Sequence, residues 1–211
     1  MKFVKTLILS SFILVFSAFQ AFAQADQSNT VTYTTQKGTD MVIEGTSTIH
    51  DWEAEVQQVD ATLTFDSAAI NNESIKSGGF LKDVKIEVPV EKIEGDRSGM
   101  NGKIYDALKK KKHPKITYKL EKADLANAAD SGNTFELNTT GSLNIAGVSK
   151  TVNFPVKGEL LSNGNVKFSG SYSLDMTDYK VDPPSAVFGT IKSGKDITIK
   201  FDLVVGLQQS L

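Results

Sequence analysis

The sequence of 211 residues contains no cysteine and only two histidines. The lack of cysteine excludes disulfide bonds, cysteine-based metal sites and a lipidated cysteine, so the fold must be stable through its core alone. His50 and His113 lie on different expected elements without paired ligand spacing, so no metal site is expected. The sequence also has no Gly-x-Ser-x-Gly elbow and no glycine-rich phosphate loop. Neither a catalytic residue nor a cofactor site is therefore predicted.

The first 23 residues have the three parts of a secretory signal peptide. Lys2 and Lys5 give a positive start, Thr6 to Phe19 is apolar, and Ala21-Phe22-Ala23 supplies small residues before a cleavage site. The apolar run is shorter than the roughly 20 residues that a membrane-spanning helix needs. We therefore expect cleavage after Ala23, a periplasmic or secreted protein, and one mature domain over residues 24–211.

Acidic residues slightly outnumber basic ones, with 25 against 23 and a net charge of −2. Loss of Lys2 and Lys5 with the signal peptide would lower the net charge to −4. A nucleic-acid-binding protein is expected to carry a basic face, so nucleic acid is not expected as a partner. The main basic run is Lys109–Lys112, which is explained most simply as a solvated helix end. Its functional alternative is a weak, transient contact with anionic lipid head groups at a membrane surface.

Apolar and polar residues alternate along most of the chain after residue 30. Val84, Ile86, Val88 and Val90 are one such row. Because successive side chains of a strand point to opposite faces, this pattern predicts strands with one dry and one wet face. The expected strands, eight or nine in all, are 31–35, 39–44, 53–59 with 61–65, 84–90, 116–120, 135–145, 152–156, 166–176 and 197–205. The expected turns between them are Lys37-Gly38, Ser77–Gly79, Ser131–Asn133, Asn163–Asn165 and Ser193–Lys195.

One segment, Met100–Lys112, has apolar residues at helical spacing. Asn101 could cap this helix, and His113-Pro114 would end it. Many short strands with one short helix fit either a closed barrel or a two-sheet sandwich, and periodicity alone does not choose between them.

Four stretches, in order along the chain, resemble the signature motifs of one known family. They are Ile43–Trp52 with its His-Asp-Trp corner, Tyr105–Leu108 followed by His113–Ile116, Gly141–Val152, and Met176–Tyr179 followed by Pro183-Pro184. From about Thr30 to Leu207 the sequence resembles the YceI-like family of lipocalin-like exported proteins. The resemblance implies an all-β fold, an eight-stranded antiparallel barrel with one short helix. It also implies an elongated apolar cavity that binds a polyisoprenoid, a quinone or a similar amphiphilic lipid.

A ligand inside such a barrel would touch side chains on the inward face. The expected ligand-binding residues are Ile43, His50, Trp52, Phe65, Ile86, Val88, Tyr105, Leu108, Tyr118, Phe135, Leu143, Phe154, Phe168, Tyr172, Leu174, Tyr179 and Phe188. Among these, His50, Tyr105 and Tyr179 are candidates for contact with a ligand head group at the mouth of the barrel. The alternatives are an ordinary packed core for the aromatic residues and a structural corner for His50.

The sequence therefore favours a periplasmic binding or carrier protein, not an enzyme, with an isoprenoid or other apolar lipid as its partner. An enzyme acting on a lipid-like substrate in the same cavity and a ligand-free stress or structural protein stay open as alternatives. An outer-membrane barrel is disfavoured because the outward face of such a barrel must be apolar. The oligomeric state is open, with a dimer as one option.

Overall fold

The computed structural model describes residues 29–71, 75, 78–95, 97, 99–129, 133–186 and 189–208. The expected signal peptide and the expected ligand-binding residue Phe188 lie outside this part. The strands are β1 (Thr30–Thr35), β2 (Asp40–Ser47), β3 (Trp52–Val56), β4 (Asp60–Asp66), β5 (Leu81–Pro89), β6 (Ile93–Gly95), β7 (Lys115–Ala128), β8 (Thr134–Ile145), β9 (Val148–Leu160), β10 (Val166–Asp175), β11 (Ser185–Ala186) and β12 (Ile191–Leu207). The helices are α1 (Ser67–Asn71) and α2 (Met100–Ala107), and two short 3₁₀ helices are η1 (Val90–Lys92) and η2 (Met176–Tyr179).

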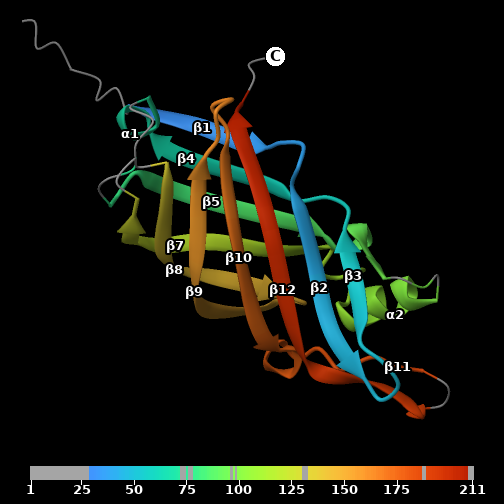
Figure 1. Ribbon diagram of the computed structural model, residues 1–211. Coiled ribbons are helices and arrows are strands. Elements are labelled where there is room, and N and C mark those ends of the chain that lie inside the picture. Colours follow the sequence, from blue (N-terminus) through green and yellow to red (C-terminus); the bar gives the residue numbers. More distant parts are fainter. Residues whose placement is uncertain are drawn as a thin grey trace, which may run out of the picture.

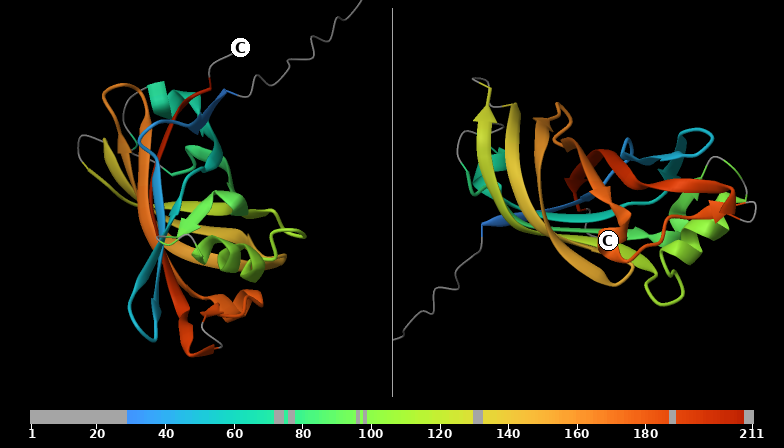
Figure 2. Two further views of the ribbon diagram at one scale, coloured as in Figure 1. Left: turned by 90° about the vertical axis from the view of Figure 1, so that its right-hand side faces the viewer. Right: turned by 90° about the horizontal axis from the view of Figure 1, so that it is seen from below.

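Eight antiparallel strands close into a barrel (Figures 1 and 2). Their order around the ring is β1-β4-β5-β7-β8-β9-β10-β12. The ring closes because β12 also pairs with β1, where Tyr33 lies opposite Leu207 and Thr35 lies opposite Val205. The prediction of an eight-stranded antiparallel barrel is confirmed, and the sandwich alternative is wrong.

Three further strands, β2, β3 and β6, extend the barrel at one end. β1 and β2 both pair with β12, so they form one long interrupted strand. In the same way β3 continues into β4, and β5 continues through η1 into β6. Beyond β6 the chain forms α2 before it returns as β7. The backbone amide of Gly95 at the end of β6 donates to the Asn101 side chain on α2 (2.9 Å). Asn101 therefore ties the helix to the sheet and does not cap it, contrary to the prediction.

The helix is also shorter than the expected Met100–Lys112, because it ends at Ala107. Lys109 adopts a left-handed conformation (φ 56°). The amide of Lys110 donates to the Tyr105 carbonyl (2.9 Å), as in a Schellman motif, which ends helices in this way. The four lysines thus form turns after the helix.

Of two turns predicted at glycine-containing segments, one is confirmed and the other is wrong. Asn163–Asn165 forms the expected tight turn between β9 and β10, with Gly164 at positive φ (82°). Ser193–Lys195 is not a turn. It lies within β12 as a bulge against β2, between Ser193 and Ile197. A bulge and a turn share the same glycine-containing sequence pattern, which explains the error.

One end of the barrel interior is solid. Five aromatic rings, those of Tyr33, Phe65, Phe80, Phe135 and Phe168, form a chain of contacts with centroid distances of 5.1 to 6.3 Å. Edge-to-face and offset pairs at these distances are favourable. Phe65 lies near the end of β4, which leads directly into α1, so this aromatic cluster closes the α1 end of the barrel. In the described part of the chain, no helix is long and apolar enough to span a membrane.

Candidate functional site: an apolar interior

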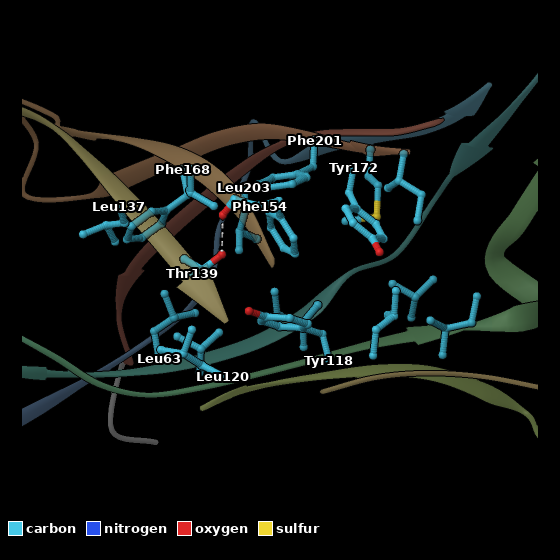
Figure 3. A pocket seen from close by; sticks show the side chains of 18 of the residues that line it. Leu63, Tyr118, Leu120, Leu137, Thr139, Phe154, Phe168, Tyr172, Phe201 and Leu203 are labelled. Carbon is cyan, nitrogen blue, oxygen red and sulfur yellow. Dashed lines mark hydrogen bonds between the residues drawn. The ribbon is translucent and has the colours of Figure 1, made fainter. Parts of the chain in front are cut away.

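Next to the aromatic cluster lies a central cavity of about 140 Å³ (Figure 3). Its wall is apolar apart from the side chain of Thr139 and the hydroxyls of two tyrosines. The lining residues are Met41, Leu63, Leu81, Val84, Ile86, Val88, Ile116, Tyr118, Leu120, Leu137, Thr139, Leu143, Phe154, Val156, Phe168, Tyr172, Ile199, Phe201 and Leu203.

A second, smaller cavity of about 80 Å³ lies on the α2 side. We call it the lower cavity. Its lining residues are Ile43, Trp52, Ala54, Ile93, Ile104, Ala107, Leu108, Ile116, Ile145, Leu174, Met176, Tyr179, Val181, Pro184, Ile197 and Ile199. Ile116 and Ile199 line both cavities, so the two spaces adjoin at these side chains. None of the described residues that line either cavity is charged.

The interior is hollow here because large rings lie against the wall instead of standing toward the axis. Gly170 lies directly opposite Phe201, and a Cβ at Gly170 would come within 2.7 Å of the Phe201 ring. A Cβ at Gly141 would likewise come within 2.5 Å of the Tyr118 ring and hydroxyl. Each glycine leaves a space that the ring from a neighbouring strand occupies. Phe154 contacts both Tyr118 and Phe201, with ring centroids 5.7 and 6.3 Å apart.

The barrel wall has a seam between β9 and β10. These strands pair only from Val156 to Leu160 and from Val166 to Gly170. Pro155 precedes the paired stretch, and proline cannot donate to a ladder. Beyond this point the rings of Phe154 and Tyr172 face each other at 5.3 Å between centroids. Side chains therefore close the cavity wall where the backbone ladder ends.

Among the described residues, two buried side-chain hydroxyl groups make no hydrogen bond of ordinary geometry. They belong to Tyr118 in the central cavity and Tyr179 in the lower one, and both oxygens are buried. Burial raises the pKa of Tyr118 above its usual 10.0, and the neighbouring Thr139 hydroxyl opposes this shift. Burial, with smaller contributions from Tyr172 and Asp178, raises the pKa of Tyr179 to about 12. Both groups are thus neutral donors at physiological pH.

The structure places most of the expected ligand-binding residues on the cavity walls. Of these, the central cavity is lined by Ile86, Val88, Tyr118, Leu143, Phe154, Phe168 and Tyr172. The lower cavity is lined by Ile43, Trp52, Leu108, Leu174 and Tyr179. Phe65 and Phe135 line neither cavity, because they belong to the aromatic cluster that fills the closed end. The contact of any of these side chains with a ligand stays a prediction.

Two of the three polar residues expected at the mouth, His50 and Tyr105, have local partners instead, while Tyr179 lines the lower cavity. His50 lies on the exposed turn between β2 and β3, where its Nδ1 is 2.6 Å from the carbonyl oxygen of Asp51. The Tyr105 hydroxyl donates to the carbonyl of Glu91 (3.0 Å). Neither residue lines a cavity. Among the described residues, no group of three or more His, Asp or Glu side chains could hold a metal ion.

Several residues of the cavity wall were not predicted from the sequence, including Met41, Ile116, Ile199 and Phe201. The signal was present, since Ile199 and Phe201 share the inward parity of the last strand and Ile116 shares that of Tyr118. Thr139 was harder to recognise, because a threonine in an inward row gives no sign of facing a cavity.

A closed eight-stranded antiparallel barrel around an apolar interior defines a lipocalin-like protein. Within that class, the chain belongs to the YceI-like family, since the model of the YceI-like domain matches residues 20–205. No curated protein matches the chain in a sequence comparison.

Solved structures share the fold at low sequence identity. Burkholderia cenocepacia BcnA is 19% identical, with a TM-score of 0.59 over 79% of this chain and 95% of that one. A polyisoprenoid binding domain from Saccharophagus degradans, implicated in plant cell wall breakdown, is 11% identical, with a TM-score of 0.61 over 84% of this chain and 99% of that one. Campylobacter jejuni YceI protein is 18% identical, with a TM-score of 0.52 over 74% and 85% of the two chains.

Proposed function

We propose that this protein binds an amphiphilic lipid with a long apolar chain, such as a polyisoprenoid or a quinone, inside its barrel. The observation that carries the proposal is an interior space whose walls are apolar and uncharged over two adjoining cavities. Apolar walls of this kind favour chains over polar substrates, because burial of apolar surface drives binding. The polyisoprenoid-binding domain of similar fold supports the same ligand class.

The size of the cavities sets a condition on this proposal. An engineered cavity of about 150 Å³ takes up benzene, so the central cavity of about 140 Å³ has room for one ring-sized group. A longer chain must also enter the lower cavity. Ile116 and Ile199 stand between the two spaces, so we expect their side chains to move when a chain binds.

We further propose that the protein acts as a carrier or reservoir outside the cytoplasm, in the periplasm or as a secreted protein. The signal-peptide pattern of residues 1–23 supports export. Lys109–Lys112 follow α2, whose Leu108 end lines the lower cavity. Their position supports a transient contact with a membrane surface during ligand transfer.

The test is ligand recovery from the protein purified from its native cells. Mass spectrometry of an organic extract is expected to show an apolar compound at near-stoichiometric amount. Ile116→Phe places a larger ring at the junction of the cavities, and we expect it to reduce binding of an apolar fluorescent probe at least about tenfold, since cavity-filling groups compete with ligand.

Thr117→Phe is the matched control. Thr117 is the next residue of the same strand and points to the opposite face, so its replacement should leave probe binding unchanged. Thermal unfolding of both variants checks that they are folded. An extract no richer than that of an unrelated exported protein, together with no probe binding by the wild type, would instead favour a ligand-free structural protein.

A further inference from the structure

The unpartnered hydroxyl of Tyr118 is unusual for the interior of a barrel. Its oxygen is buried in a cavity whose wall is apolar apart from this hydroxyl and those of Thr139 and Tyr172. A buried polar group without a partner costs about 1–3 kcal/mol, so such groups in native proteins call for an explanation. The Tyr118 ring crosses the inward face of Gly141, and its hydroxyl points toward Thr139 (Figure 3).

Thr139 is the second polar group at this point. It is 6% exposed and, among the described residues, the one buried polar side chain. Its hydroxyl donates to the Phe154 carbonyl at 2.7 Å (Figure 3). Because that proton is already used, Thr139 has only lone pairs to offer. The Tyr118 hydroxyl interacts with these lone pairs, which opposes the effect of burial on its pKa, but it does not reach hydrogen-bond geometry, so its proton can be donated to a ligand.

We propose that the central cavity binds a neutral hydrogen-bond acceptor of the ligand, such as a carbonyl oxygen, at the Tyr118 hydroxyl. The apolar chain of the ligand then extends through the lower cavity toward α2. The ligand thus enters with its polar group first. This inference rests on the proposed function and specifies its ligand class.

The acceptor must be neutral because, in the part of the chain that the structure describes, no charged side chain lines either cavity. A carboxylate or phosphate at this depth would lose its hydration without gaining a counter-charge, which is far more costly than burial of a carbonyl. Fatty acid anions and prenyl phosphates would therefore not place their head groups here.

The position of the acceptor follows from the polar groups around the two tyrosines. Tyr179 is 2% exposed and lines the lower cavity, where the other lining side chains are apolar apart from Trp52. The indole nitrogen of Trp52 already donates to the Thr46 carbonyl (2.9 Å). Tyr118 in contrast has Thr139 beside it, so the central cavity is the more polar of the two.

The test compares dodecane and 2-dodecanone as competitors of a bound fluorescent probe. Tyr118→Phe is expected to lower the ratio of 2-dodecanone affinity to dodecane affinity by about five- to tenfold, because one buried hydrogen bond is lost. In the wild type, dodecanoate at pH 8 should compete at least about tenfold more weakly than 2-dodecanone. Dodecane and 2-dodecanone differ in water solubility, but this difference is the same for every variant. It therefore cancels when the affinity ratio is compared between variants.

Tyr33→Phe is the matched control, since the Tyr33 hydroxyl donates to the Gly164 carbonyl (3.2 Å) outside the cavities. This variant should keep the wild-type ratio, whereas Tyr179→Phe tests whether the acceptor lies in the lower cavity instead. A second measurement is the infrared carbonyl stretch of bound ¹³C-labelled 2-dodecanone, which should lie at lower frequency in the wild type than in Tyr118→Phe.

An unchanged ratio and an unchanged carbonyl stretch in Tyr118→Phe overturn the inference while the proposed function stands. A lowered affinity ratio in Tyr179→Phe, together with an unchanged ratio in Tyr118→Phe, also overturns the inference. If the wild type binds neither dodecane nor 2-dodecanone, the proposed function fails with it.

Discussion

The aromatic residues of this barrel occupy their positions because glycines on neighbouring strands make room for them. Tyr118 over Gly141 and Phe201 beside Gly170 surround the central cavity, and Phe135 lies directly opposite Gly158 at the closed end. A ring that lies along the wall buries its surface without filling the axis. Small residues on the inward face thus determine how much of the interior stays empty.

Gly141→Ala tests this relation at the level of one residue. The added Cβ would meet the Tyr118 ring, which must then leave the wall and enter the cavity. We expect the free energy of unfolding to fall by about 1–3 kcal/mol, as in overpacked cores, and probe affinity to fall with it. Chemical denaturation and probe titration measure the two effects.

Gly102→Ala serves as its control, because nothing lies within 4 Å of a Cβ at this position of α2. Alanine in a helix interior should raise stability by about 0.5–1 kcal/mol and leave probe binding unchanged. If Gly141→Ala behaved like Gly102→Ala, the role assigned to the inward glycines would be wrong.

Among the elements, η2 has a special position because it follows β10 where that strand no longer pairs with β9. Asp175 fixes this junction. Its carboxylate accepts from the Thr177 amide (2.9 Å) and from the Lys195 ammonium on β12 (2.6 Å). The 3₁₀ helix that carries Tyr179 to the lower cavity is thereby attached to two strands.

The ion pair at Asp175 predicts a specific pH dependence. The Lys195 hydrogen bond and those of Thr177 lower the pKa of Asp175 from 3.8 to about 2. A lowered pKa means that the folded state holds the carboxylate ionised, so its stabilisation is present above pH 4 and is lost as the pH falls through about 2. Asp175→Asn keeps the cap, since asparagine also caps helices. It should lower Tm slightly at pH 7, and the difference should disappear between pH 4 and 2.

Thermal melts of the wild type and Asp175→Asn across this pH range measure the effect. Asp124→Asn, which removes an exposed carboxylate paired with Lys122 (2.6 Å), is the control and should change Tm less at pH 7. A constant difference between wild type and Asp175→Asn from pH 7 to pH 2 would contradict the assignment.

The strands could be predicted from the sequence better than their ends. Alternation in rows such as Val166 to Leu174 is a direct consequence of one dry face, and it gave both strand and inward parity. The end of α2 could not be predicted in this way, because it depends on Lys109 adopting a left-handed conformation that lysine rarely takes. The bulge at Ser193 likewise depends on pairing with β2, which no local pattern contains.

For the whole molecule, the decisive contact is the pairing of β12 with β1, which converts a sheet into a barrel. Residues at the two ends of the chain make this contact, so alternation alone could not distinguish the barrel from a sandwich. The same limit applies to the interior. Inward parity is shared by Phe135 in the solid end and Phe154 in the cavity wall, and only the three-dimensional arrangement separates them.

The whole barrel therefore has a solid end near α1, a central cavity, and a lower cavity beside α2. Because the aromatic cluster fills the other end, we expect a chain-like ligand to enter from the α2 side or through the seam between β9 and β10.

A crystal structure of the protein isolated from its native cells tests the central claim most directly. We predict elongated electron density that runs through both cavities, with the side chains of Ile116 and Ile199 displaced to join them. Two separate, empty cavities with both side chains in their present positions, in crystals soaked with an apolar chain compound as well, would contradict the account.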